Sequence, residues 1–255
     1  MASLTLALGL LGQGSFAQEG PSKAEILRLL GGISALPEIR ASVAQSGYEG
    51  ENLDLAVAQM ARMLGDDAIA SHIAERILAA GRGDWQTAKA AQGLIQPLLA
   101  RGMGHLAPRE LQYFLEVERV VMGALSLRSC GLIFKNRLGP EAIAKRTAEA
   151  AARLNTPALR EYYRIQYKAA RLGATRPPKR LEPAMRAQTR AEIGAALSAA
   201  AAADPAAQAA LADFERIDRV SAVRACVAGR FFLDVVMTME PRARHAALLT
   251  LSVGE

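Results

Sequence analysis

Residues 53–65 read LDLAVAQMARMLG, and this stretch sets the pattern for the rest of the chain. Its large apolar side chains recur every three to four residues, at Leu53, Val57, Met60 and Leu64. That spacing gathers them on one face of an α-helix. Gly65 follows the last of them, at a position where helices commonly end. The stretch therefore predicts an amphipathic helix of about three turns.

Similar signals lie on both sides of this helix. Upstream, Ser22 and Glu25 form a capping-box pattern ahead of ILRLL, and Gly31-Gly32 predicts the end of that helix. Downstream, Asp66 predicts the cap of a helix whose apolar face is Ile69, Ile73 and Ile77 and whose predicted end is Gly81. A further helix is expected over about residues 84–100, interrupted by Pro97.

Prolines mark the later helix starts, because proline is well tolerated in the first turn. They are Pro108, Pro140, Pro157, Pro205 and Pro241. Thr156 is the expected cap before Pro157, and Asp204 before Pro205. Residues 173–183, GATRPPKRLEP, predict a loop, since three prolines forbid a regular helix there. No stretch alternates as a strand does, so we expect an all-α bundle of about nine to eleven helices.

The only two cysteines, Cys130 in SLRSCGLIF and Cys226 in AVRACVAGRFF, lie in the two longest helical patterns. These patterns predict two long cysteine-bearing helices, over about 108–138 and 205–239. Each cysteine shares a face with small residues, which permit the short Cα separation that a disulfide needs. A Cys130–Cys226 disulfide is the favoured prediction. Two free buried thiols are the main alternative, while a metal or redox pair is disfavoured because no histidine lies near either cysteine and no C-x-x-C is present.

The first seventeen residues, MASLTLALGLLGQGSFA, predict a signal peptide. An uncharged apolar run is followed by small residues at Ser15 and Ala17, although no basic residue precedes the run. A buried first helix of a cytosolic protein is the alternative. The run is too short to span a membrane, and we expect no transmembrane segment in the mature chain. Export to the periplasm or beyond would also supply an oxidising compartment for the disulfide.

Charge is unevenly distributed along the 255 residues, whose net charge is +6. Residues 18–105 carry a net charge of −2, and residues 106–255 carry +8. We therefore expect an N-terminal helical region at 18–105 and a C-terminal one at 106–255, which can also form one continuous domain. The 51% hydrophobic content argues against a disordered chain.

Signals for catalysis are few. His72 follows Asp66 and Asp67 and precedes Glu75, so an acid could lie beside its imidazole for acid–base chemistry. The stronger interpretation is that the aspartates favour a helix N-terminus. The sequence contains no nucleophile elbow, zinc-protease motif or phosphate-binding loop. We predict no catalytic residue, no metal site and no cofactor.

The segment 135–190 carries 14 basic and 4 acidic residues. Within it, four cations recur at helical spacing, at Arg160, Arg164, Lys168 and Arg171. They predict a basic helix face able to bind an anion, with Tyr163 and Tyr167 close by. The alternative is a solvated face whose arginine stems pack on apolar neighbours.

Together these patterns favour a non-catalytic binding or structural protein of the bacterial cell envelope, periplasmic or secreted. Its expected partner is an anionic envelope component or another protein, and no nucleic acid is expected if the chain is exported. Two other classes stay open. One is an exported hydrolase-like enzyme with a site near His72, and the other is a cytosolic helical protein that binds nucleic acid.

Overall fold

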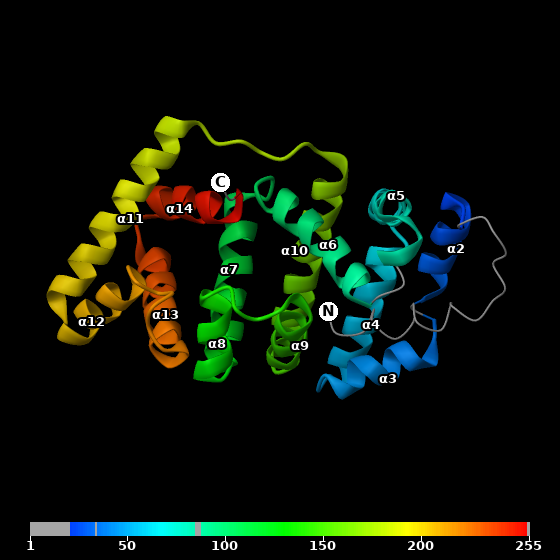
Figure 1. The fold of residues 1–255 in the computed structure, drawn as a ribbon, viewed down its shortest axis with the longest axis horizontal. Coiled ribbons are helices and arrows are strands. Elements are labelled where there is room, and N and C mark those ends of the chain that lie inside the picture. The colour runs from blue at the N-terminus through cyan, green and yellow to red at the C-terminus, as the bar shows by residue number, and fades with distance from the viewer. Residues whose placement is uncertain (1–20, 34, 85–87, 254–255) are drawn as a thin grey trace. The chain divides into compact units, whose positions relative to one another are not determined.

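The computed structural model describes residues 21–33, 35–84 and 88–253, and every regular element in these ranges is an α-helix (Figure 1). The all-α prediction is confirmed. The expected count of nine to eleven helices is wrong, because the described ranges hold thirteen. They are α2 Lys23–Ile33, α3 Pro37–Gln45, α4 Gly50–Leu64, α5 Asp67–Asp84, α6 Ala88–Met103, α7 Pro108–Ala124, α8 Leu127–Phe134, α9 Pro140–Ala151, α10 Thr156–Thr175, α11 Pro183–Ala203, α12 Pro205–Phe214, α13 Ala222–Thr238 and α14 Pro241–Val253. The predicted signal peptide lies outside the described residues.

The first of the two predicted long helices is broken into α7 and α8. The hydroxyl of Ser126 accepts a hydrogen bond from the backbone N–H of Ser129, 3.2 Å away, and caps the new helix. Asn136 then ends α8 in a left-handed conformation, with φ of 50°. The N–H groups of Asn136 and Arg137 bond back to Ile133 and Leu132, which is the Schellman pattern. Cys130 therefore lies on an eight-residue helix.

The second predicted long helix is broken in the same way, into α12 and α13. Hydrogen-bonded turns follow Phe214, and the hydroxyl of Ser221 then accepts from the N–H of Arg224 to cap α13. Cys226 lies one turn into that helix. Smaller differences have related causes: Asn155 rather than Thr156 caps α10, and α2 and α5 continue past their glycines to Ile33 and Asp84.

The helices form two compact units. Unit 1 combines the chain up to His105 with Thr147–Pro178, and so contains α2 to α6 and α10. Unit 2 combines Leu106–Arg146 with Lys179–Glu255, and contains α7, α8 and α11 to α14. Helix α9 contributes residues to both.

Unit 1 is centred on the pairing of α6 with α10. Gly102 of α6 meets the backbone of α10 so closely that an added Cβ would lie 1.7 Å from the carbonyl oxygen of Ala169. Gly173 of α10 meets the carbonyl oxygen of Leu98 in the same manner, at 1.9 Å. Leu98 and Ala169 are fully buried at this crossing. Two glycines thus let the two backbones touch, and they fix the position of α10.

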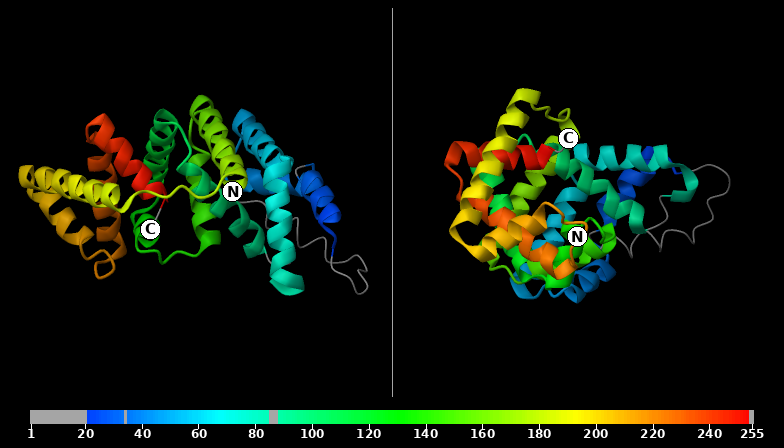
Figure 2. Two further views of the ribbon diagram at one scale, coloured as in Figure 1. Left: turned by 90° about the horizontal axis from the view of Figure 1, so that it is seen from above. Right: turned by 60° about the vertical axis from the view of Figure 1, so that its left-hand side comes forward.

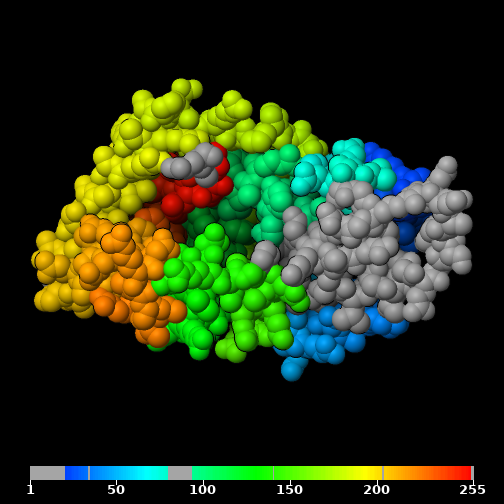
Figure 3. All heavy atoms as spheres, viewed as in Figure 1, coloured from blue at the N-terminus to red at the C-terminus, as the bar shows by residue number. Residues whose placement is uncertain are grey.

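Unit 2 contains the disulfide. The Cα atoms of Cys130 and Cys226 are 5.2 Å apart and the two sulfur atoms are bonded, as the sequence predicted. Gly131 lies against the backbone of Ala222, where an added Cβ would come within 1.6 Å of the carbonyl oxygen. This contact permits the short separation of α8 and α13. In the space-filling view the orange atoms of the α12–α13 segment lie directly beside the green atoms of α8 (Figure 3).

Other contacts hold the segment that leads into α13. Lys135 donates from Nζ to the carbonyl of Val220, and Arg137 donates to the carbonyl of Asp218 at 3.3 Å. Phe214 and Phe232 stack with ring centroids 4.6 Å apart, which joins α12 to α13. Helices α11 and α14 complete the unit, and Figure 2 shows them in yellow and red from two further directions.

Candidate functional site

The candidate anion-binding face lies on α10, a helix of 20 residues. The side chain of Asn155 caps its start by accepting from the N–H of Ala158, at 2.9 Å, and Pro157 follows in the first turn. Its inward face buries Leu159 and Ile165 completely. Because that face and Gly173 pack inside unit 1, the opposite face, which holds the predicted basic residues, points away from the core of the unit.

Arg160, Arg164 and Arg171 each meet a carboxylate within unit 1. Arg160 pairs with Glu51 of α4, and Arg164 pairs with Glu161 of its own helix at 2.7 Å. The Nε of Arg171 lies 3.4 Å from a carboxylate oxygen of Asp66. Lys168, the fourth, is half-buried. The acidic partners Glu51 and Asp66 come from distant parts of the chain, so the spacing along α10 alone did not reveal them.

These ion pairs leave the arginines accessible. The side chains of Arg160, Arg164 and Arg171 expose 60%, 44% and 62% of their surface. Exposed pairs of this kind contribute only about 0–1 kcal/mol to stability. Each guanidinium has five N–H donors, more than one carboxylate can use. A ligand with several negative charges can therefore bind these arginines at little cost to the fold.

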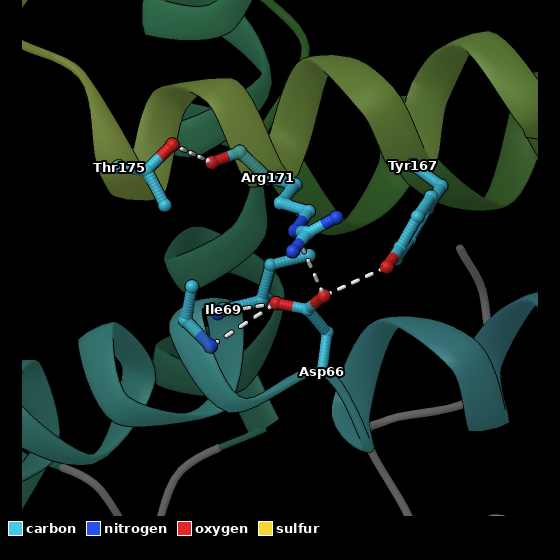
Figure 4. Close-up of polar contacts among 6 residues, drawn as sticks. Asp66, Ile69, Tyr167, Arg171 and Thr175 are labelled. Carbon is cyan, nitrogen blue, oxygen red and sulfur yellow. Dashed lines mark hydrogen bonds and ion pairs between the residues drawn. The ribbon is translucent and has the colours of Figure 1, made fainter.

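Asp66 is the most closely held carboxylate of this region (Figure 4). Its Oδ1 accepts from the backbone N–H groups of Ala68 and Ile69, both at 3.1 Å, and so caps α5. Its Oδ2 accepts from the hydroxyl of Tyr167 at 2.7 Å. The guanidinium of Arg62 lies 3.8 Å from the centre of the Tyr167 ring, a cation–π contact. Tyr167 is thereby fixed between a cation and an anion.

This arrangement determines how Asp66 titrates. Burial alone would raise the pKa of the carboxyl, but the hydrogen bonds from Tyr167, Ile69 and Ala68 together with the charge of Arg171 outweigh it and lower the pKa. The same hydrogen bond to Asp66 is the main cause that raises the pKa of Tyr167. The pair is thus a neutral phenol donating to an ionised carboxylate at ordinary pH.

We expect the protein to lose stability in acid through Asp66. A carboxyl whose pKa is lowered by folding stabilises the native state above its unfolded pKa, about 3.9, and that contribution disappears as the pH falls through the lower folded value. Asparagine caps helices as well as aspartate does, so Asp66→Asn keeps the cap and loses only the charge. Because hydrogen bonds to a charged group are stronger than those to a neutral one, the free energy of unfolding should be lower by about 1 kcal/mol at pH 7. The difference from wild type should shrink below pH 4. Urea unfolding of both proteins at pH 7 and at pH 3 measures this difference in the free energy of unfolding. A difference that is the same at both pH values would contradict the role assigned to Asp66.

Tyr163 does not belong to the exposed basic face. Its hydroxyl donates to the hydroxyl of Tyr48, 2.9 Å away, and Gln59 donates to its backbone carbonyl at 3.0 Å. Burial is the main cause that raises the pKa of both tyrosines. Tyr163 therefore ties α10 to the segment before α4, and of the two predicted aromatic neighbours only Tyr167 lies among the cations.

His72 lies in the second turn of α5 and contacts a cation. Its Nε2 is 3.1 Å from Nη2 of Arg101, and arginine can only donate, so Nε2 is the acceptor. Burial is the first cause that lowers the pKa of His72, and the charge of Arg101 is the second. Glu75 accepts from Lys23 at 2.8 Å and from Ser71. The imidazole is thus neutral, and the lone pair that a general base would use is engaged by Arg101.

Within residues 21–33, 35–84 and 88–253, no group of three or more His, Cys, Asp or Glu residues is arranged to hold a metal ion. Among the helices of those ranges, none has the length and apolar character that crossing a membrane requires.

Comparisons of the chain with protein-family models, with curated proteins and with solved structures found no match.

Proposed function

We propose that this chain is a non-catalytic binding protein of the bacterial cell envelope, which recognises an anionic component through Arg160, Arg164, Lys168 and Arg171. The signal-peptide pattern of residues 1–17 supports localisation of the protein in the cell envelope. The disulfide is consistent with an oxidising compartment. The observation that carries the binding role is the high exposure of three arginines on one helix whose other face is rigidly held.

The chemistry favours a ligand with several negative charges. A single small anion would have to compete with Glu51, Glu161 and Asp66, each already beside one arginine. A surface of phosphate headgroups or a polyanion presents many charges at once, and binding at several points adds up. Bidentate contact with phosphate also suits guanidinium groups better than ammonium groups.

We expect the purified protein to bind vesicles that contain phosphatidylglycerol, and not vesicles of phosphatidylcholine alone. Binding should weaken as salt rises, since the screening length falls from about 10 Å at 0.1 M to about 3 Å at 1 M. Replacing Arg160, Arg164 and Lys168 with glutamine should abolish it while circular dichroism stays unchanged. Co-sedimentation with vesicles measures the bound fraction.

A matched control removes the same charge elsewhere. Arg40, Arg109 and Arg242 are exposed and lie outside α10. Their replacement with glutamine should leave most of the vesicle binding intact. If both triple variants lose binding equally, net charge alone is responsible; if the α10 variant binds like wild type, the face is only a solvated surface.

A further inference from the structure

The arginines on and around α10 differ in how far their N–H donors are already engaged. Arg164 donates from both Nε and Nη2 to Glu161, at 2.7 and 2.8 Å, so the edge that can hold an anion at two points is occupied. Arg160 donates from Nη2 to Glu51. Both arginines therefore share their donors with a carboxylate of the protein.

The guanidinium of Arg171 is less engaged. Its Nε lies 3.4 Å from Oδ2 of Asp66, beyond the usual range of about 2.7–3.2 Å for an N–H···O hydrogen bond. That oxygen already accepts from the hydroxyl of Tyr167. The side chain of Asp66 is only 10% exposed, whereas that of Arg171 is 62% exposed. A ligand that approaches from solvent therefore meets the guanidinium before the carboxylate.

Arg62 of α4 is a further cation, which the spacing along α10 could not reveal. The residue is exposed, and its guanidinium lies 3.8 Å from the centre of the Tyr167 ring. No carboxylate whose side chain the structure describes forms an ion pair with it. The contact with the ring attracts the positive charge but takes up no oxygen acceptor. The N–H donors of Arg62 are therefore left for a ligand.

Arg62 and Arg171 border the same tyrosine. Arg62 lies over the ring of Tyr167, and Arg171 lies beside Asp66, the carboxylate that the tyrosine hydroxyl contacts. Tyr167 and Arg171 are four residues apart and share a face of α10, and Figure 4 shows both side chains pointing toward Asp66. The two least engaged of these arginines thus lie around one residue, although they are more than 100 residues apart in the sequence.

Tyr167 restrains the guanidinium that lies over it. Its hydroxyl donates to Oδ2 of Asp66, and Oδ1 of the same carboxylate accepts from the backbone at the start of α5. The ring is therefore held at its hydroxyl end by a fixed point of the fold. A cation that rests on a restrained ring loses less conformational freedom on binding than one on a free side chain, and this preorganisation increases affinity.

We propose that Arg62 and Arg171 bind a phosphate group of the anionic component, and that Tyr167 positions Arg62 for this contact. The planar guanidinium matches two oxygens of a phosphate group at once, which the ammonium of lysine cannot do. The inference rests on the function proposed above and names the chemical group that the surface recognises. Lipid headgroups and soluble phosphate esters both present this group.

Variants that preserve charge test the role of Arg62 and Arg171. Arg62→Lys keeps the positive charge and loses the planar fork, so affinity for vesicles that contain phosphatidylglycerol should fall about tenfold, the effect of one hydrogen bond to a charged group. Arg171→Lys should act in the same direction. Arg153→Lys is the matched control and should leave affinity unchanged, because Arg153 is exposed and precedes α10, about three turns from Tyr167. Co-sedimentation over a range of lipid concentrations measures the affinity.

A double-mutant comparison tests the positioning role of Tyr167. Tyr167→Leu removes the ring under Arg62 and leaves both arginines in the chain, and affinity should fall. Adding Arg62→Lys to it should cause little further loss, because residues that act as one unit do not have additive effects. Losses that multiply would contradict the positioning role. If the ring contact serves stability alone, Arg62→Lys lowers the urea midpoint and leaves vesicle affinity unchanged, which also contradicts the proposal.

Glycerol phosphate in solution distinguishes the two sources of phosphate, with calorimetric titration as the measurement. Binding of glycerol phosphate that weakens in Arg62→Lys supports recognition of the phosphate group itself. Vesicle binding that depends on Arg62, without binding of glycerol phosphate, supports recognition of phosphate in lipid headgroups. Wild-type binding that neither Arg62→Lys nor Arg171→Lys weakens overturns this inference and leaves the proposed function intact. A wild-type chain that binds neither probe overturns both.

Discussion

Replacement of Gly102 with alanine should lower the free energy of unfolding by about 3 kcal/mol or more. The new methyl group would lie 1.7 Å from the carbonyl oxygen of Ala169 and 2.9 Å from the backbone nitrogen of Gly173. Both atoms are backbone atoms within α10, so no side-chain rotation relieves the clash. The helices α6 and α10 must move apart, and overpacking of this kind usually costs 1–3 kcal/mol and sometimes more.

A matched control separates this effect from the helical preference of the residue. Gly194 lies inside α11, and an added Cβ there would meet nothing within 4 Å. Gly194→Ala should therefore stabilise the protein, by about 0.5–1 kcal/mol, because alanine favours helix over glycine. Urea unfolding followed by circular dichroism compares the two variants. Equal stability of Gly102→Ala and Gly194→Ala would show that α6 and α10 are not in backbone contact.

Removal of the disulfide should have an effect of similar size in unit 2. Cys130 and Cys226 are separated by 96 residues. In the chain-entropy treatment, closing a loop of this length lowers the entropy of the unfolded chain and so stabilises the folded state by about 4–5 kcal/mol. Replacing both cysteines with alanine should lower the free energy of unfolding by up to that amount. Both residues are fully buried, so alanine fits the site without introducing a polar group.

Reductant supplies the control for this experiment. The wild-type urea midpoint should fall in the presence of a reducing agent, to about the midpoint of the double alanine variant. The variant itself should be insensitive to reductant. A wild-type midpoint that is unchanged after full reduction would contradict the stabilising role, and labelling of two thiols in the unfolded, unreduced chain would contradict the bond.

The all-α class and most helix starts could be predicted from the sequence because they depend on residues that are close together in the chain. Pro108, Pro140, Pro205 and Pro241 each begin a helix where the sequence predicted one. The breaks at Ser126 and Ser221 were missed because serine occurs both within helices and at their caps, and only the observed hydrogen bonds decide between the two.

The disulfide was predicted from the expected oxidising compartment and from the small residues near each cysteine, but the sequence showed only part of the geometric reason for it. The sequence predicted small residues on the face of Cys226, where Ala222 and Gly229 lie at helical spacing from it. Gly131, which makes the closest backbone contact, is simply the residue after Cys130. Its role depends on the crossing of two helices about 90 residues apart, and a single helical pattern carries no information about such a crossing.

The basic face was recognised by its spacing, whereas its partners were not. Glu51 and Asp66 lie more than 100 residues before the arginines that they meet. Nothing in the local pattern of residues 156–175 indicates that this basic helix packs among α4, α5 and α6, in the acidic half of the sequence. The uneven charge distribution was interpreted as a division into two regions, and it did not indicate that an acidic and a basic segment would pair.

The discontinuous composition of the two units has a consequence for the order in which the chain can fold during synthesis. Residues up to 105 emerge first, yet α6 lacks its main partner until α10 has been made. Unit 1 can therefore be completed only after about two thirds of the chain has left the ribosome. Cys226 emerges later still. The cysteine pair is oxidised after every residue of unit 1 is present, so the disulfide acts on a chain whose first unit is already able to form.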